Sequence, residues 1–360
     1  MMALFSIPGL HLKAVSAAVP VHEVCNEDLD LLNDPHGRDF VQAVGIKTRR
    51  VAPPAICASD LCVAAAQHIL EQLGLRPAEI GVLVFVTQTP DYPLPGNSML
   101  AQHRLGLPSS TYLVDLNQGC AGYVYGLASL ASLMNATHID RGLLLVGDTI
   151  TRVLSSKDRG TFPIFSDAGS ATLLEQAPQA EAIHFNLGSE GKGADIIQVR
   201  GGGARQPFTT NGLVVNEDEP NVPCAPIHLT MRGLDVLHYS LKYVSSSIQE
   251  LLTFANCTFE TPDYFVFHQA NRILNETLLK KLGISSDRAP ESLFEYGNTS
   301  SATIPVTICH RLGEVLGHSS KKLLLSGFGA GFSWGSALIN ADSVLCPKLL
   351  EISEPHGTQA

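Results

Sequence analysis

Three short motifs in this chain carry side chains that could take part in nucleophilic catalysis. The first is a polar, glycine-containing turn from Asp115 to Cys120, followed by small and apolar residues typical of a buried helix. Unpaired backbone N–H groups and the dipole at a helix N-terminus favour a thiolate, so we expect a lowered pKa for Cys120. Because the same N–H groups can stabilise an oxyanion, this turn predicts a nucleophile together with its oxyanion hole.

The other two motifs supply neutral hydrogen-bond donors. His268 ends a short apolar run predicted to be a strand, and a neutral imidazole there can donate to a carbonyl from Nε2 or exchange a proton. Asn298 lies in a Gly-Asn-Thr-Ser-Ser turn, and its amide has two donors that could share a carbonyl with His268. Taken singly, the three residues also have structural interpretations: a buried thiol at a tight turn, a satisfied histidine and a helix N-cap.

The glycine-rich segment Gly327–Gly335 follows a predicted strand, and its alternating glycines allow the backbone to approach a ligand closely. Its spacing differs from the dinucleotide-binding fingerprint, and the chain has no phosphate-binding lysine motif, so nucleotide phosphate chemistry is excluded. The eight cysteines are scattered, with no CxxC pair and no histidines at zinc spacing. We therefore expect free thiols and no metal site.

The composition excludes several further classes of protein. Of the 360 residues, 45% are hydrophobic and the net charge is −10, which excludes a disordered chain and disfavours a general nucleic-acid-binding face. No apolar run reaches the ~18 residues of a membrane span, and His11 and Lys13 interrupt the N-terminal apolar stretch. We expect neither a span nor a signal peptide, and a cytoplasmic location.

The motifs need a scaffold, and the alternation of predicted strands and helices indicates a layered α/β fold. The predicted strands are Val82–Thr87, Tyr112–Leu116, Gly142–Val146, Tyr264–His268 and Lys322–Ser326. The predicted helices are Ala58–Leu73, Gly122–Met134, Met231–Phe254, Arg272–Leu282 and Thr303–Leu316. The stretch from Gly201 to Pro226 is rich in Gly and Pro and predicts an irregular insertion.

Two parts of the chain resemble each other. In each part a buried strand is followed by a site motif that opens a helix, and a second strand follows about 60 residues after the first. The motif is the Cys120 turn in the first part and the Asn298 turn in the second. This repeat predicts two similar halves, residues 1–180 and 181–360, which would bring Cys120, His268 and Asn298 to one central cleft.

Five motifs, in order between Asp115 and Leu338, together resemble the β-ketoacyl-acyl-carrier-protein synthase III family. They are GCAGYVYGL, DRGTFPIFSDAGSATLL, VFHQANRIL, YGNTSSATIP and LLLSGFGAGFSWGSALI. The resemblance implies a thiolase-like fold, in which two pseudo-symmetric halves form a five-layered αβαβα core. It also implies a homodimer that acts on coenzyme A or phosphopantetheine thioesters, with acyl carrier protein as partner and no cofactor.

The resemblance further implies roles for individual residues. It assigns the catalytic triad to Cys120, His268 and Asn298, and the oxyanion hole to the backbone N–H groups of Cys120 and Ala330, where the family usually has Gly. The residues implied in substrate or pantetheine binding are Arg159, Asn271 and Leu94. The residues implied in carrier-protein docking are Arg272, Lys280 and Lys281.

The implied activity is a decarboxylative Claisen condensation. An acyl thioester acylates Cys120, a malonyl thioester loses carbon dioxide beside His268 and Asn298, and the resulting carbanion attacks the acyl group. Two alternatives are acyl transfer from Cys120 to an oxygen or nitrogen nucleophile without decarboxylation, and a non-catalytic partner subunit like the chain-length factors of polyketide synthases. Those factors lack the active cysteine, so Cys120 argues against the second alternative.

Three departures from the family pattern bear on the substrate. The segment Asp39–Ile46 lacks the Trp and Arg that often clasp the coenzyme A adenine, and the insertion Gly201–Pro226 has no counterpart. Leu94 stands where the family commonly has a Phe that reaches into the acyl pocket of the partner subunit. Together these departures predict a secondary-pathway relative whose substrates differ from acetyl-CoA.

Overall fold

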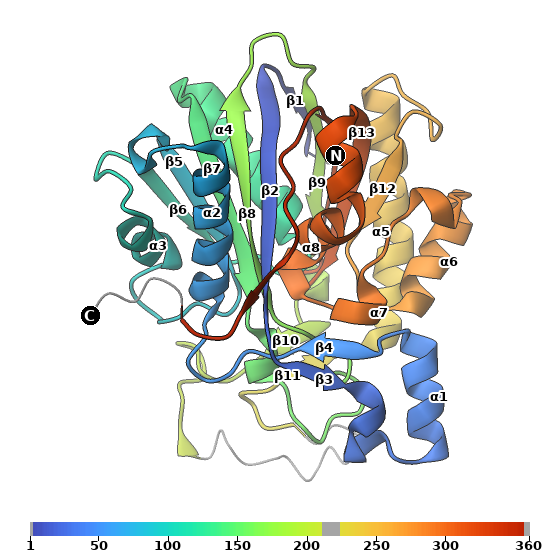
Figure 1. The fold of residues 1–360 in the computed structure, drawn as a ribbon. Coiled ribbons are helices and arrows are strands. Elements are labelled where there is room, and N and C mark those ends of the chain that lie inside the picture. The colour runs from blue at the N-terminus through green and yellow to red at the C-terminus, as the bar shows by residue number, and fades with distance from the viewer. Residues whose placement is uncertain (1–2, 211–223, 356–360) are drawn as a thin grey trace.

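A six-stranded mixed β-sheet forms the core of the first half in the computed structural model, which describes residues 3–210 and 224–355 (Figure 1). Its strands lie in the order β15-β2-β8-β7-β5-β6. Their bounds are β2 (Leu10–Pro20), β5 (Val82–Val86), β6 (Tyr112–Leu116), β7 (Arg141–Asp148), β8 (Ala168–Gln176) and β15 (Leu350–Ile352). Strand β5 is entirely buried, as expected for a parallel strand with both faces covered.

A five-stranded sheet, in the order β1-β9-β14-β13-β12, forms the core of the second half. Its strands are β1 (Ala3–Ile7), β9 (Ile183–Ser189), β12 (Tyr264–Phe267), β13 (Lys321–Gly329) and β14 (Ser333–Ala341). The order and directions of β9-β14-β13-β12 repeat those of β2-β8-β7-β5. Strand β6 has no counterpart in the second sheet within the described residues. The predicted pseudo-symmetry is therefore confirmed.

Helices complete a stack of five layers (Figure 1). The outer face of the first sheet is covered by α2 (Ala58–Leu73) and α3 (Asn97–Leu105), and that of the second by α5 (Gly233–Phe254) and α6 (Arg272–Leu282). Between the sheets lie α4 (Gly122–Thr137) and α8 (Thr303–Thr307), which contact strands of both. Helix α4 is apolar on nearly all sides because it is packed between two sheets. The predicted αβαβα fold is confirmed.

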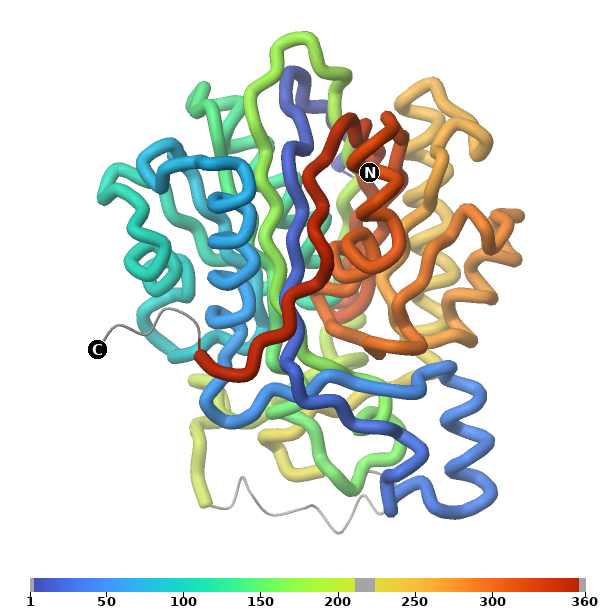
Figure 2. The backbone as a smooth tube through the Cα atoms, viewed as in Figure 1, coloured from blue at the N-terminus to red at the C-terminus, as the bar shows by residue number. Residues whose placement is uncertain are grey.

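The two ends of the chain join the halves together. Strand β1 pairs with β9 of the second sheet, and β15 pairs with β2 of the first. Before β15, the C-terminal segment runs beside β2 (Figure 2), where Val15 and Leu345 share a backbone hydrogen bond of 2.9 Å. The predicted boundary at residue 180 falls between β8 and β9, and the division into two units stays a prediction.

Short elements close one end of the layers, at the bottom of Figure 1. They are β3 (Glu23–Cys25), α1 (Pro35–Val44), β4 (Thr48–Arg50), β10 (Ile197–Val199) and β11 (Leu229–Met231). Strands β10 and β11 flank the predicted insertion, whose residues 211–223 lie outside the described residues. The described residues include no helix that is both long and apolar enough to cross a membrane.

The predicted helix Thr303–Leu316 is helical throughout but is not one regular α-helix. It consists of α8, a π-helical turn over Ile308–Leu312 and α9 (Gly313–His318). A short helix, α7 (Leu293–Tyr296), precedes the Asn298 turn. The other four predicted helices and all five predicted strands are present, with ends shifted by a few residues.

Candidate active site

Cys120 lies between β6 and α4, two residues before the first helical residue, Gly122. The turn is tight, since the Gly122 N–H donates to the Gly119 carbonyl at 2.6 Å. Two backbone N–H groups, those of Cys120 itself and of Ala330, lie within hydrogen-bonding reach of the thiol. The structure therefore brings together the nucleophile and the two predicted oxyanion-hole donors.

The end of β13 is rich in glycine because its backbone lies directly against Cys120. A Cβ atom at Gly329 would lie 2.8 Å from the Cys120 sulfur, and one at Gly327 would lie 2.8 Å from the Cys120 carbonyl oxygen. Only glycine leaves room at these positions. We expected these glycines to admit a ligand, and in the structure they admit the nucleophile itself.

The prediction of a lowered pKa for Cys120 is wrong. Burial raises the pKa of this thiol to about 12, and the charge of Asp148 raises it further. Hydrogen bonds from the two N–H groups and from the Ser300 hydroxyl lower it but do not offset the burial. A helix terminus contributes typically 0.3–1 kcal/mol, less than the cost of desolvating a thiolate between two sheets. Cys120 is therefore a thiol at neutral pH.

His268 follows the last residue of β12 and is almost completely buried. Its backbone N–H donates to the Ser326 carbonyl at 2.8 Å, and its Nδ1 lies 2.7 Å from the Thr303 hydroxyl. The Phe328 ring packs edge-on against the imidazole. Burial lowers the pKa of His268 to about 3, so the ring is neutral at pH 7, as the proposed donor role needs.

The side chain of Asn298 is held in one orientation by its own loop. Its Oδ1 accepts the Ser300 N–H at 2.9 Å, and its Nδ2 donates to the Ala270 carbonyl at 3.3 Å. The backbone is fixed as well, because the Asn298 N–H donates to the Ile164 carbonyl at 3.0 Å. An amide nitrogen carries two protons, so one Nδ2–H is left for a ligand in the described part of the chain.

Cys120, His268 and Asn298 line one small cavity of about 30 Å³. The rest of its wall is largely apolar and includes Ile164, Phe165, Ile197, Met231, Val236 and Phe328. The structure thus gathers the three predicted residues around one small, largely apolar cavity.

A second cavity, of about 620 Å³, lies beside α1. Three cationic side chains contribute to its wall: Arg38, Lys47 and Arg272. Asn271 lines the small cavity and its chain neighbour Arg272 lines the large one, so both cavities border the start of α6. The sequence analysis noted only that the segment Asp39–Ile46 lacks a Trp and an Arg. In the structure, part of this segment forms the wall of the larger cavity.

The remaining predicted binding residues are more dispersed. Asn271 also caps α6, since its Oδ1 accepts the Leu274 N–H at 2.9 Å. Arg159 forms an ion pair of 2.8 Å with Asp34, which follows the cavity residue Asn33. Leu94 is 86% exposed and touches neither cavity within this chain.

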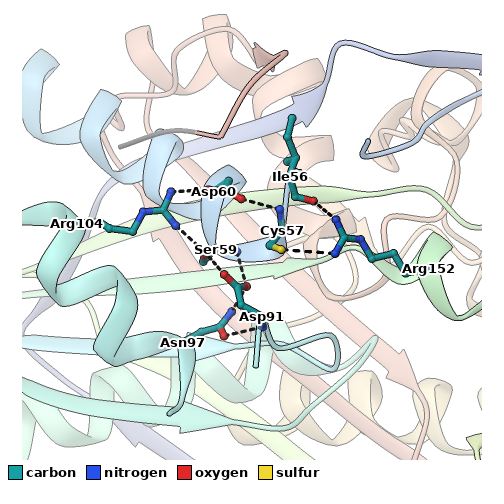
Figure 3. A network of polar contacts seen from close by, with 8 residues as sticks. All are labelled: Ile56, Cys57, Ser59, Asp60, Asp91, Asn97, Arg104 and Arg152. Atoms are coloured by element: carbon teal, nitrogen blue, oxygen red, sulfur yellow. Dashed lines mark hydrogen bonds and ion pairs between the residues drawn. The ribbon is translucent and has the colours of Figure 1, made fainter. Parts of the chain in front are cut away.

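A network of polar contacts holds the base of the loop that carries Leu94 (Figure 3). Asp91 accepts the Ser59 hydroxyl at 2.5 Å and the Asn97 amide at 3.0 Å. Arg104 in turn donates to the Ser59 hydroxyl at 2.6 Å and forms an ion pair of the same length with Asp60. The loop is therefore anchored to α2 and α3 while its tip projects into solvent.

The three predicted docking residues do not form one group. Lys280 and Lys281 are exposed at the end of α6, and the Lys281 ammonium donates to the Leu241 carbonyl at 2.5 Å. Arg272 lies at the start of the same helix and donates to the Gln42 carbonyl of α1. Arg272 therefore belongs to the wall of the larger cavity, some two to three helical turns from the lysines.

Sequence reasoning missed three residues around the site. Ser300 hydrogen-bonds to the Cys120 thiol, and Thr303 contacts His268. Asp148, at the end of β7, accepts the Ser301 hydroxyl at 2.6 Å and the Gln88 N–H at 2.7 Å, and so ties the Asn298 loop to the first half. The run of Ser and Thr residues that follows Asn298 in the sequence is the feature that could have pointed to Ser300 and Thr303.

Comparisons with known proteins show which family the chain is similar to. Two family models match the chain: 3-oxoacyl-(acyl-carrier-protein) synthase III over residues 114–191, and the C-terminal part of the same family over residues 252–341. A protein of Natranaerobius thermophilus named β-ketoacyl-(acyl-carrier-protein) synthase III is 31% identical over 331 residues, covering 91% of this chain and 97% of the relative.

Solved structures are similar as well. A 3-oxoacyl-(acyl-carrier protein) synthase from Burkholderia xenovorans superposes with a TM-score of 0.92 and 34% identity, covering 98% of this chain and 99% of the other. The priming β-ketosynthase of the R1128 polyketide pathway has a TM-score of 0.79 and 25% identity, covering 95% and 98%. The similarity therefore extends over both halves of the chain.

Proposed function

Because this chain belongs to the 3-oxoacyl-acyl-carrier-protein synthase III family, we propose that its own Cys120, His268 and Asn298 carry out the decarboxylative condensation of that family. The observation that carries this proposal is the shared cavity, in which a buried thiol with two backbone N–H donors faces two neutral side-chain donors. Each step is a polar acyl or proton transfer, so the proposed mechanism uses no metal or redox cofactor.

The first half-reaction acylates Cys120. The sulfur attacks the carbonyl of an acyl thioester, and the N–H groups of Cys120 and Ala330 hold the oxyanion. The bond between the acyl carbon and the donor sulfur breaks as the bond to Cys120 forms. The proton of the Cys120 thiol leaves with the departing donor thiolate, so the enzyme keeps no charge from this step.

The second half-reaction uses His268 and Asn298. When the malonyl thioester loses carbon dioxide, the electrons of the broken C–C bond move into an enolate whose oxygen accepts from His268 Nε2–H and Asn298 Nδ2–H. The enolate carbon then attacks the acyl group and forms the new C–C bond. Cys120 leaves as a thiolate and takes one proton from water, which is the proton that the second half-reaction consumes. A pair of neutral donors suits an enolate, whereas transfer to an oxygen or nitrogen nucleophile needs a base instead.

A panel of acyl thioesters tests this proposal. Incubation with an accepted donor should add the mass of one acyl group to the intact chain, and later addition of malonyl thioester should remove it and yield a 3-oxoacyl product. The result against the proposal is an acyl-enzyme that malonyl thioester leaves unchanged.

The larger cavity fits the phosphorylated part of such a thioester. Coenzyme A and phosphopantetheine carry phosphate groups, and Arg38, Lys47 and Arg272 provide cationic donors for them. From there the thiol arm would pass Asn271 to reach Cys120. The large cavity thus supports thioesters of this class as substrates.

We also propose that the active form is a homodimer. Exposed apolar side chains gather on the Asp91–Gly96 loop, on α3 and on β6, namely Tyr92, Leu94, Met99 and Tyr112. Strand β6 is the edge of its sheet, and an edge strand offers unpaired N–H and C=O groups to a second copy. Pairing there would carry Leu94 toward the acyl site of the partner.

Replacing Leu94 by Phe should shift the acyl preference toward short chains. We expect the wild-type enzyme to prefer donors longer than acetyl, because Leu fills less of the acyl pocket than the aromatic ring of the family. Each buried methylene is worth roughly 0.8 kcal/mol, so two methylenes change the selectivity more than about tenfold. The measurement is kcat/KM for acetyl and hexanoyl donors in both proteins.

Mixed dimers provide the control for this prediction. A Cys120→Ala, Leu94→Phe subunit paired with a wild-type subunit should transfer the short-chain preference to the wild-type Cys120. Stronger selection for acetyl by the wild type than by Leu94→Phe would contradict the expected role of Leu94.

Reversing the charge of Lys280 and Lys281 should weaken only the use of carrier-bound substrate. Acyl carrier proteins are acidic, and on a chain of net charge −10 a focused basic patch is needed to attract them. For the Lys280→Glu, Lys281→Glu variant we expect a raised KM for malonyl-carrier and little change for a small pantetheine thioester. The wild-type KM for the carrier should also rise with salt, since the Debye length falls from ~10 Å at 0.1 M to ~3 Å at 1 M.

A matched variant separates docking from net charge. Lys192→Glu, Lys348→Glu makes the same charge change on exposed lysines elsewhere and should leave both substrates unaffected. Equal losses on the two substrates in the Lys280, Lys281 variant would show that the carrier docks at another face.

A further inference from the structure

Two of the eight free cysteines contact each other, although they come from different elements. Cys309 is buried in the π-helical turn that follows α8, and Cys346 is partly exposed in the segment that leads from β14 to β15. Their thiols share a hydrogen bond. Cys309 belongs to the main apolar core, and Cys346 packs against that core from outside.

The backbone around the two thiols keeps them close together. At Gly313, four residues after Cys309, a Cβ atom would lie 2.8 Å from the carbonyl oxygen of Cys346 and 3.6 Å from its sulfur. Residues four apart in a helical segment lie on the same face, so Cys309 faces the C-terminal segment as Gly313 does. The contact between the thiols therefore follows from how the segment crosses the helix.

Further contacts fix the C-terminal segment at this crossing. The Cys309 sulfur lies 3.6 Å from the carbonyl oxygen of Val15 in β2, and the Val15 N–H donates to the Leu345 carbonyl at 2.9 Å. On the other side, the Val344 N–H donates to the Leu316 carbonyl of α9 at 3.0 Å. The segment is thus held by a strand of the first half and a helix of the second, where it runs beside β2 (Figure 2).

We propose that Cys309 and Cys346 are a site of reversible disulfide formation, which joins the C-terminal segment covalently to the helical turn after α8 when the protein is exposed to hydrogen peroxide. Neither cysteine lines the cavity of Cys120, so this cross-link is separate from the proposed condensation. Its formation can be measured without turnover.

The oxidation takes two steps and consumes one peroxide. Cys346 reacts first because its thiol is the more exposed of the two: its sulfur attacks the peroxide, the O–O bond breaks, and a sulfenic acid and one water form. The sulfur of Cys309 then attacks that of Cys346, and the S–S bond forms as the S–O bond breaks. The hydroxyl leaves with the Cys309 proton as a second water, so the two thiols lose two hydrogen atoms in total.

The cross-link would close a loop of the chain that contains α9, β13 and β14. A disulfide stabilises a protein mainly by restricting the unfolded chain, so we expect the Tm of the oxidised protein to rise by a few degrees. It would also keep the segment docked on β2. The amide of Leu345, which donates to the Lys13 carbonyl at 3.0 Å, should therefore exchange its hydrogen more slowly after oxidation.

Hydrogen peroxide is the probe that tests this inference. The treated wild-type protein should lose about 2 Da, the mass of two hydrogen atoms, and should yield one cross-linked peptide containing Cys309 and Cys346. Dithiothreitol should reverse both changes. The variant Cys346→Ser should form no such peptide, and its Tm and its exchange at Leu345 should be the same with and without peroxide.

Cys257→Ser is the matched control, because it removes another partly exposed thiol and should leave the cross-link as in the wild type. Cys309→Ala removes the resolving thiol, so Cys346 should gain about 32 Da as a sulfinic acid instead. Two results would overturn the inference. One is oxidation of Cys346 in the wild type without a bond to Cys309, and the other is a cross-link that leaves exchange at Leu345 unchanged.

Discussion

Cys120→Ala should form no acyl-enzyme and should lose condensation activity by at least about 10³-fold, because both half-reactions pass through the Cys120 sulfur. Peptide mapping after brief exposure to an acyl thioester should find the acyl group on Cys120 alone. Burial raises the pKa of Cys62 and Cys309 as it raises that of Cys120, so the position in the site and not the pKa distinguishes the nucleophile. Neither Cys62 nor Cys309 lines the cavity that Cys120 shares with His268 and Asn298.

Because the pKa of Cys120 is raised, we expect the rate of its acylation to increase with pH. The free enzyme holds a thiol at pH 7, and only the thiolate is strongly nucleophilic. The rate of acylation should therefore rise by up to about tenfold per pH unit above neutrality, with no plateau near pH 7. Cys257→Ser, which changes a partly exposed thiol elsewhere, should behave as wild type. Labelling chiefly at Cys62 or Cys309 would contradict the assignment of the nucleophile.

His268→Ala and Asn298→Ala should each become acylated on Cys120 and yet release carbon dioxide from malonyl thioester about 10²–10³-fold more slowly. Each variant removes one donor to the enolate oxygen, and loss of such a donor typically costs ~2.7–4 kcal/mol of barrier. Rapid-quench measurement separates the two half-reactions, by intact mass for acylation and by labelled carbon dioxide for decarboxylation.

A control with a histidine outside the site guards against a general effect on folding. His318 is exposed on α9, and His318→Ala should keep both half-reactions at the wild-type rate. Undiminished release of carbon dioxide by both site variants would show that the enolate is stabilised by other groups. Loss of acylation in both would instead place His268 and Asn298 in the first half-reaction.

The elements that could be predicted from the sequence are those with continuous apolar, β-branched runs. Strand β5 reads Val-Leu-Val-Phe-Val, and such a run is typical of a buried parallel strand. Strands β2 and β8 were missed because Ala, Ser and Gly interrupt their runs of larger apolar residues, and Ala and Gly have a low β-propensity. At Gly169 the reason is tertiary: a Cβ there would lie 2.5 Å from that of Leu61 in α2.

The site divides in the same way. Cys120, His268 and Asn298 could be predicted because each stands where a strand or turn meets a helix or loop, and the internal repeat places the Cys120 and Asn298 turns at equivalent positions. The raised pKa of Cys120 could not be predicted from the sequence, because it depends on how the two sheets exclude water from the thiol. The contact of Thr303 with His268 could not be predicted either, because the two residues are 35 positions apart and the contact depends on the packing of α8.

The most direct measurement of the central claim follows the acyl group out of the enzyme. Enzyme carrying a labelled acyl group on Cys120 is isolated and mixed with malonyl thioester in a single turnover. We predict that the label appears in a 3-oxoacyl thioester two carbons longer than the acyl group, with one carbon dioxide released per product. Transfer of the label to water or to an oxygen or nitrogen nucleophile, without carbon dioxide, would contradict decarboxylative condensation by this chain.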